Sequence, residues 1–141
     1  ASANPKSNAR GYEVWYLPPE VRRNVLDEKE MEQHKEIAPI MNTMLEEEYT
    51  IESVMLARKI LAGMDTQVSK MTENRGLKAE KWYVVRKAMM PAVLIELGFI
   101  TNKEEAYLLT QDSYLNKLSK GIYNGIFNFI DYFENTKGFT E

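Results

Sequence analysis

Cysteine is absent from this sequence of 141 residues, and histidine occurs once. Without cysteine the chain forms no disulfide, no thiolate zinc site and no cysteine nucleophile. No apolar run approaches the roughly 20 residues that cross a bilayer, and the first residues show neither the basic nor the apolar region of a signal peptide. Lysine and arginine are scattered and the formal net charge is −3, so we expect no nucleic-acid partner.

The composition is typical of a folded chain with one hydrophobic core. Hydrophobic residues make up 44% of the sequence, and a chain of this length can bury one core without a second domain. Short apolar segments alternate with longer segments of helical periodicity, as in α/β proteins. We therefore expect one domain, or part of one.

The stretch Met90–Asn102 is the most informative part of the chain. A short apolar run is ended by Gly98, and Asn102 supplies a helix-start signal, so the stretch predicts a strand buried on both faces that leads into a helix. Glu96 lies among the apolar residues of this strand. Such a carboxylate either pairs with a cation, for which Arg86 is a candidate, or has a raised pKa. The second alternative makes Glu96 a candidate catalytic residue.

Two further strands are predicted, over Gly11–Leu17 and Lys81–Arg86, where aromatic and branched residues are concentrated. The second of them closely precedes the strand that contains Glu96, so we expect these two to be neighbours in one sheet. On the first strand Glu13 alternates with Trp15. It either faces a solvated or site-lining side, or forms a salt bridge, which is the more frequent arrangement.

Helical periodicity predicts three helices in the rest of the chain. The first begins at Thr50 or Ser53 and ends near residue 74, with apolar residues spaced three and four apart. The second covers residues 102–111, and the third runs from 112 to about 136. Gly121 and Gly125 lie four apart on the third helix, where we expect them to permit close approach to the sheet. Residues 137–141 are expected to be a frayed tail.

Residues 20–49 form an acidic segment of helical character. Between Asp27 and Glu48 there are eight acidic residues and two lysines. Pro39 divides the segment, which predicts two helices or one helix and an irregular piece. Acidic runs are usually solvated, and His34 most simply lies on the same surface rather than binding a metal.

Three blocks of the sequence carry a resemblance to a known family. They are Asn8–Leu17, then Arg75–Lys78 with Trp82–Arg86, and finally Met90–Asn102. Their residues and their order resemble the C-terminal part of the zinc-dependent N-acetylmuramoyl-L-alanine amidases of the amidase-3 family. The resemblance is interrupted only between about residues 18 and 50, and three blocks in register make it specific.

The resemblance implies an α/β fold with a twisted mixed sheet flanked by helices in three layers. It implies that residues 1–136 are the C-terminal portion of a catalytic domain whose N-terminal strands are missing, with residues 20–49 as an insertion. In the family, zinc is held by a His and a Glu early in the domain and by a second His in a Ser-any-His-any-Asn motif, which precedes a stretch like Ala1–Asn4. We therefore expect all three ligands upstream of Ala1, and no zinc at the amidase site of this chain alone.

The resemblance also implies a reaction. The family hydrolyses peptidoglycan at the amide bond between N-acetylmuramic acid and the L-alanine of the stem peptide. Glu96 occupies the position of the general acid/base that works beside a zinc-bound water. The complete enzyme is then expected to be a periplasmic or extracellular bacterial cell-wall hydrolase, and the isolated fragment is expected to be inactive.

A regulatory partner is implied in addition. In some related amidases an insertion near this place forms a helix whose glutamate blocks the zinc until a partner protein displaces it, and Glu46, Glu47 and Glu48 are the candidates for that role. A solvated helix face is the simpler interpretation of these residues. The alternative function is a non-catalytic α/β module that binds peptidoglycan or a partner protein, and a third is an unrelated α/β interaction domain.

Overall fold

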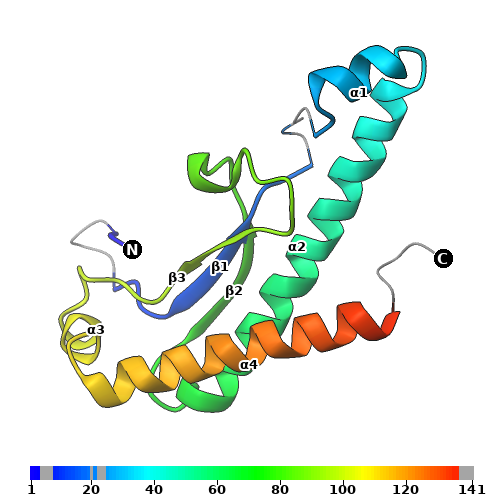
Figure 1. Cartoon of the computed structure of the whole chain (residues 1–141). Coiled ribbons are helices and arrows are strands. Elements are labelled where there is room, and N and C mark those ends of the chain that lie inside the picture. The colour runs from blue at the N-terminus through cyan, green and yellow to red at the C-terminus, as the bar shows by residue number, and fades with distance from the viewer. Residues whose placement is uncertain (4–7, 20, 22–24, 137–141) are drawn as a thin grey trace.

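The computed structural model describes residues 1–3, 8–19, 21 and 25–136. Within these ranges a three-stranded sheet packs against two long helices that cross each other (Figure 1). The strands are β1 (Tyr12–Tyr16), β2 (Asn74–Ala79) and β3 (Val93–Glu96). The helices are α1 (Glu28–Gln33), α2 (Ala38–Val68), α3 (Lys103–Leu108) and α4 (Asp112–Thr136), with a 3-10 turn, η1 (Tyr83–Val85). The predicted α/β class with a mixed sheet and flanking helices is confirmed.

The sheet has the strand order β2-β1-β3, in which β1 pairs parallel with β2 and antiparallel with β3. The prediction that residues 81–86 form a strand next to β3 is wrong, because this segment contains η1 and β2 is the strand that pairs with β1. The parallel pairing brings Arg75 and Lys78 to Glu13, whereas Val85 is the one buried residue between 81 and 86. Strand propensity is weak enough for such tertiary contacts to override it.

The two faces of the sheet have different surroundings. Tyr12 and Val14 of β1 are fully buried in the core that the sheet forms with α2 and α4. Because side chains alternate along a strand, Glu13 and Trp15 project from the other face. The residues of β3 are half-buried rather than buried on both faces as predicted, since β3 is an edge strand of the described sheet.

The helix α2 is continuous, so the predicted start at Thr50 or Ser53 is wrong. It begins at Ala38 with Pro39 in its first turn, where the missing N–H costs no hydrogen bond. The hydroxyls of Thr50 and Ser53 donate to carbonyl oxygens four residues earlier, at 2.8 and 2.6 Å, as hydroxyl side chains do inside helices. The predicted division of the acidic segment at Pro39 is confirmed, and the helix ends at Val68 rather than near residue 74.

The helices α2 and α4 cross with their backbones in contact. A Cβ atom on Gly125 would lie 2.4 Å from the Cα atom of Ile60, and one on Gly121 would lie 2.7 Å from the Cα atom of Met64. The third glycine of the contact is Gly63 of α2, where an added Cβ would lie 2.2 Å from a carbonyl oxygen of α4. The prediction that the glycines of α4 approach the sheet is therefore wrong, because they approach α2.

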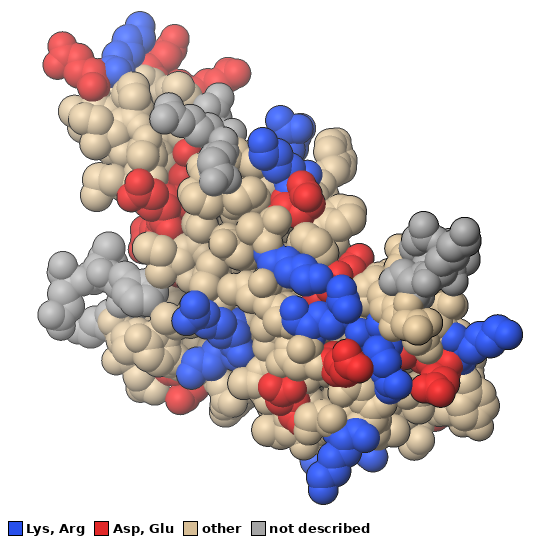
Figure 2. Space-filling view, turned by 180° about the vertical axis from the view of Figure 1, so that it is seen from behind, with Lys and Arg blue, Asp and Glu red and all other residues tan. Residues whose placement is uncertain are grey.

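The predicted positions of α3 and α4 are confirmed. The side chain of Asn102 caps α3 by accepting from two backbone N–H groups at 3.1 and 3.2 Å, and α4 begins at Asp112. The expected tail at residues 137–141 lies outside the described residues, as do residues 20 and 22–24 of the acidic segment. Within the described ranges no helix is both long and apolar enough to span a membrane. Figure 2 shows basic and acidic side chains interspersed on the face seen from behind.

Candidate active site

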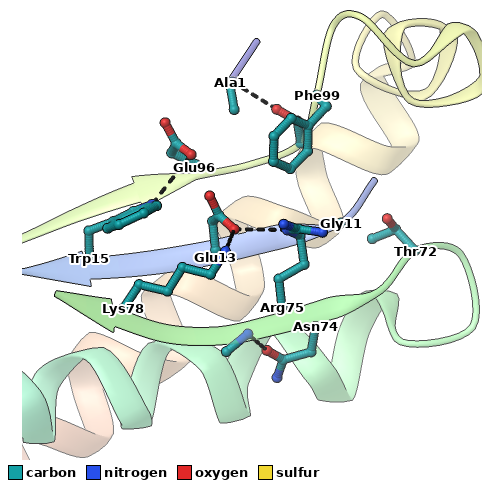
Figure 3. A network of polar contacts seen from close by, with 12 residues as sticks. Ala1, Gly11, Glu13, Trp15, Thr72, Asn74, Arg75, Lys78, Glu96 and Phe99 are labelled. Carbon is teal, nitrogen blue, oxygen red and sulfur yellow. Dashed lines mark hydrogen bonds and ion pairs between the residues drawn. The ribbon is translucent and has the colours of Figure 1, made fainter. Parts of the chain in front are cut away.

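Glu96 is the last residue of β3 and lies opposite Glu13 of β1. Both carboxylates project from the sheet face that points away from α2, together with Trp15 (Figure 3). The indole N–H of Trp15 donates to Oε2 of Glu96 at 3.3 Å. Glu96 is half-buried and forms no ion pair with any other described residue. The proposed pairing of Glu96 with Arg86 is therefore wrong.

The ion pairs of this face are made by Glu13, whose exposed fraction is 3%. Its Oε2 atom accepts from Nε of Arg75 at 2.8 Å and from Nζ of Lys78. Both cations come from β2, and the parallel register of β1 and β2 places them there. Burial acts to raise the pKa of Glu13, but the bonds to the two cations outweigh it and lower the pKa to about 2. The interpretation of Glu13 as a salt-bridged strand carboxylate is confirmed.

The pKa of Glu96 shifts in the opposite direction. Burial raises it, and the hydrogen bond shared with Glu13 and the charge of Glu13 raise it further, against the amino group of Ala1 and the indole of Trp15. Because Glu13 bonds two cations and stays ionised, Glu96 is the member of the pair whose pKa is raised. Two neighbouring carboxylates with pKa values driven apart are suited to acid–base chemistry, one as proton carrier and the other as fixed charge.

Residues 1–3 lie along the chain that leaves β3. The backbone nitrogen of Ala1 donates to the carbonyl of Gly98 at 2.8 Å, and the N–H of Ile100 donates to the carbonyl of Ala1 at 3.1 Å. Two bonds that flank one residue in this way form a parallel pairing. The N–H of Ala3 donates to Oγ1 of Thr101 at 3.1 Å. These residues therefore lie next to the end of β3 that carries the candidate acid, while residues 4–7 of the same loop lie outside the described residues.

Glu105 holds this region together, although no pattern in the sequence marks it. Its exposed fraction is 1%. Oε1 accepts from the N–H of Gly11 at 2.5 Å and from the hydroxyl of Thr72, and Oε2 accepts from the N–H of Phe99 at 2.7 Å. The side chain thereby joins the start of β1, the turn before β2 and the chain after β3. An acid in the first turn of a helix is ordinary in sequence, so the pattern gave no signal for this role.

The structure does not bring Glu46, Glu47 and Glu48 next to Glu96. The hydroxyl oxygen of Ser53 on α2 accepts from the N–H of residue 92 at 3.0 Å, just before β3 begins. The three glutamates lie further toward the start of α2, away from the end of β3. His34 is exposed at the C-terminal end of α1. Among the residues that the structure describes, no three His, Cys, Asp or Glu side chains are grouped to hold a metal ion.

Fold and geometry together define an α/β domain with a half-buried carboxylate of raised pKa at the end of a strand. The family model described as N-acetylmuramoyl-L-alanine amidase matches residues 1–128. The chain therefore belongs to the amidase-3 family, as its three sequence blocks predict.

Two curated proteins match parts of the chain. The chain is 38% identical over 77 residues to the uncharacterized protein YqiI of Bacillus subtilis strain 168, covering 53% of this chain and 37% of that protein. It is 41% identical over 54 residues to the N-acetylmuramoyl-L-alanine amidase LytC of the same strain, covering 38% of this chain and 11% of that protein.

The fold is similar to that of the CwlD amidase from Clostridioides difficile, whose structure was solved in complex with the GerS lipoprotein. The TM-score is 0.64 at 24% identity, over 93% of this chain and 51% of that chain. The chain thus spans about half of the solved structure and less of the two curated relatives.

Proposed function

We propose that this chain is the C-terminal part of the catalytic domain of an N-acetylmuramoyl-L-alanine amidase. The substrate is peptidoglycan, and the bond cut is the amide between N-acetylmuramic acid and the L-alanine of the stem peptide. The observation that carries this proposal is the arrangement at the end of β3, where Glu96 with its raised pKa lies beside the ionised Glu13. The family membership supports the same reaction.

In this proposal Glu96 is the general acid/base. It takes a proton from the water that attacks the scissile carbonyl and delivers it to the leaving amine. A carboxyl whose pKa is raised toward the working pH both accepts and releases a proton more readily than an ordinary carboxylate. Glu13 does not share this role, because Arg75 and Lys78 hold it in the ionised form.

Zinc dependence is part of the proposal. The described residues of this chain do not form a metal site by themselves. We place the ligands in a segment that precedes Ala1. Because Ala1 pairs parallel to the chain at Phe99, a preceding segment would continue beside Leu97 and Glu96. The isolated chain is then without zinc and inactive.

The proposed amidase function also implies a cellular location and a regulatory partner for this protein. A peptidoglycan hydrolase acts in the periplasm or outside the cell, and we assign this protein there. A regulatory protein that acts on residues 20–49 is a further part of the proposal, with Glu46, Glu47 and Glu48 as the residues to test. It is supported by the similarity to CwlD, which was solved with a lipoprotein partner.

The test is the variant Glu96→Gln in the complete enzyme, assayed by release of stem peptides from purified cell wall. We expect turnover to fall by roughly 100-fold to 10,000-fold, with zinc content and thermal unfolding unchanged. The matched control is Glu104→Gln, since Glu104 is an exposed acid that pairs with Arg10 at 3.1 Å. Near-normal turnover in Glu96→Gln would remove Glu96 from the mechanism. A complete protein that binds cell wall but releases no peptide would instead indicate the non-catalytic module.

A further inference from the structure

The segment between β2 and β3 presents three apolar residues to solvent in succession. The exposed fractions of Trp82, Tyr83 and Val84 are 36%, 79% and 71%. The next residue, Val85, is 4% exposed and anchors the turn. Solvent-exposed aromatic residues that cluster in this way mark interaction sites more often than isolated ones do. We call Trp82, Tyr83 and Val84 the aromatic ledge.

The aromatic ledge is continuous with the candidate active site. The ring of Trp82 meets the ring of Trp15 edge-on, with centroids 5.7 Å apart and an interplanar angle of 84°. Trp15 in turn donates to Glu96. The ledge therefore lies on the same face of the sheet as the candidate acid, and Figure 1 shows the turn that carries it on the side of the sheet away from α2.

Three cations flank the aromatic ledge: Lys81, Arg86 and Lys87 are all exposed. None of them forms an ion pair with another residue in the described ranges. Arg75 and Lys78, in contrast, are both paired with Glu13. The ledge is thus an aromatic surface with positive charge at its margin, which complements a ligand that combines an apolar face with carboxylates.

We propose that the aromatic ledge is a sugar-binding subsite that takes an N-acetylated pyranose ring of the glycan strand. One face of such a ring consists of C–H groups, whose positive edges are attracted to the negative face of an aromatic ring. The flanking cations attract the carboxylates of the same polymer. The assignment rests on the proposed function, and it adds that Trp82 and Tyr83 recognise the sugar on one side of the scissile amide.

The test compares two substrates that share the scissile amide, a disaccharide-peptide and a lactyl-peptide without the sugar. In the complete enzyme, Tyr83→Ala and Trp82→Ala should each raise the KM for the disaccharide-peptide by about threefold to tenfold. Their kcat should not change, and their kinetics on the lactyl-peptide should equal those of the wild type. The control is Tyr123→Ala on α4, which changes an exposed tyrosine away from the sheet. It should change neither KM nor kcat on either substrate.

An equal loss on both substrates would show that the aromatic ledge contacts the peptide or only supports the fold, and would overturn the proposal. So would a lower melting temperature of Tyr83→Ala with unchanged kinetics, because the ledge would then be covered by another part of the enzyme. Unaltered kinetics in both ledge variants would overturn it as well.

A binding measurement distinguishes failure of the proposed amidase function from failure of the proposed sugar subsite. The chain contains two tryptophans, Trp15 and Trp82, and both belong to the surface in question, so its intrinsic fluorescence reports on the aromatic ledge. Titration of the chain with the N-acetylated disaccharide should give a saturable change that weakens by about threefold to tenfold in Tyr83→Ala. Binding without any hydrolysis by the complete enzyme would retain the subsite and reject the amidase. Hydrolysis by the complete enzyme without sugar binding would retain the amidase and reject the subsite.

Discussion

The ion pairs of Glu13 give the most quantitative prediction about the stability of this chain. The pKa of Glu13 is lowered from 4.5 to about 2 in the folded state, so folding favours its ionised form. Its contribution is fully present above pH 4.5 and is lost as the pH falls toward 2. This lowering of the pKa corresponds to about 3 kcal/mol of stability at pH 7 and to about half of that at pH 3. The side chains of Arg75 and Lys78 are 32% and 30% exposed, so both cations keep water when Glu13 is neutralised, and we expect no larger cost.

The variant Glu13→Gln should therefore lower the free energy of unfolding by about 3 kcal/mol at pH 7 and by about half of that at pH 3. Urea denaturation followed by far-UV circular dichroism at both pH values measures this difference. The control Glu104→Gln removes an exposed carboxylate that is 77% accessible and should change stability by about 0.5 kcal/mol or less. A loss below about 1 kcal/mol at pH 7, or an equal loss at both pH values, would refute the assignment of the low pKa to this ion-pair cluster.

Three further predictions concern packing, buried hydrogen bonds and the candidate acid. Gly125→Ala should destabilise the chain by about 3 kcal/mol, because its Cβ would lie 2.4 Å from the Cα atom of Ile60. The control Ser119→Ala, on the exposed side of α4, should cost less than about 0.5 kcal/mol. Equal melting temperatures of these two variants would contradict the close contact between α2 and α4. Glu105→Ala leaves three donors without their acceptor and should cost about 4 kcal/mol in urea denaturation; a loss under about 1 kcal/mol would show that water replaces the carboxylate. Trp15→Phe removes a hydrogen bond that lowers the pKa of Glu96, so NMR titration should find that pKa raised further, and a lower value would contradict the contact.

Local patterns predicted those elements whose signals are local. Asn102 caps α3 as expected, and the apolar strand that ends at Glu96 is present as β3. The strand predicted at residues 81–86 is absent for a physical reason. Trp82, just before η1, and Tyr83, in η1, have strand-forming side chains but remain exposed and pair with no strand. The helix start predicted at Thr50 failed because a hydroxyl that can cap a helix can equally bond a carbonyl inside one.

The candidate site was predictable in part. Glu96 was found because a carboxylate among apolar residues is unusual and because the surrounding block resembles a known family. The residues around Glu96 were not predicted. Local sequence does not give the ion-pair partners of Glu13, because the register of β1 with β2 places Arg75 and Lys78 beside it. Glu105 was missed altogether, since its three hydrogen-bond donors come from segments 6 to 94 residues away in the chain.

The sequence by itself determined the α/β class, the family and the identity of the candidate acid, because these depend on periodicity and on motifs that are contiguous along the chain. The tertiary structure decided which carboxylate has its pKa lowered and which one has its pKa raised. That division depends on distances between β1, β2 and β3, and a pKa responds to the charges that surround a group in space rather than to its neighbours in sequence.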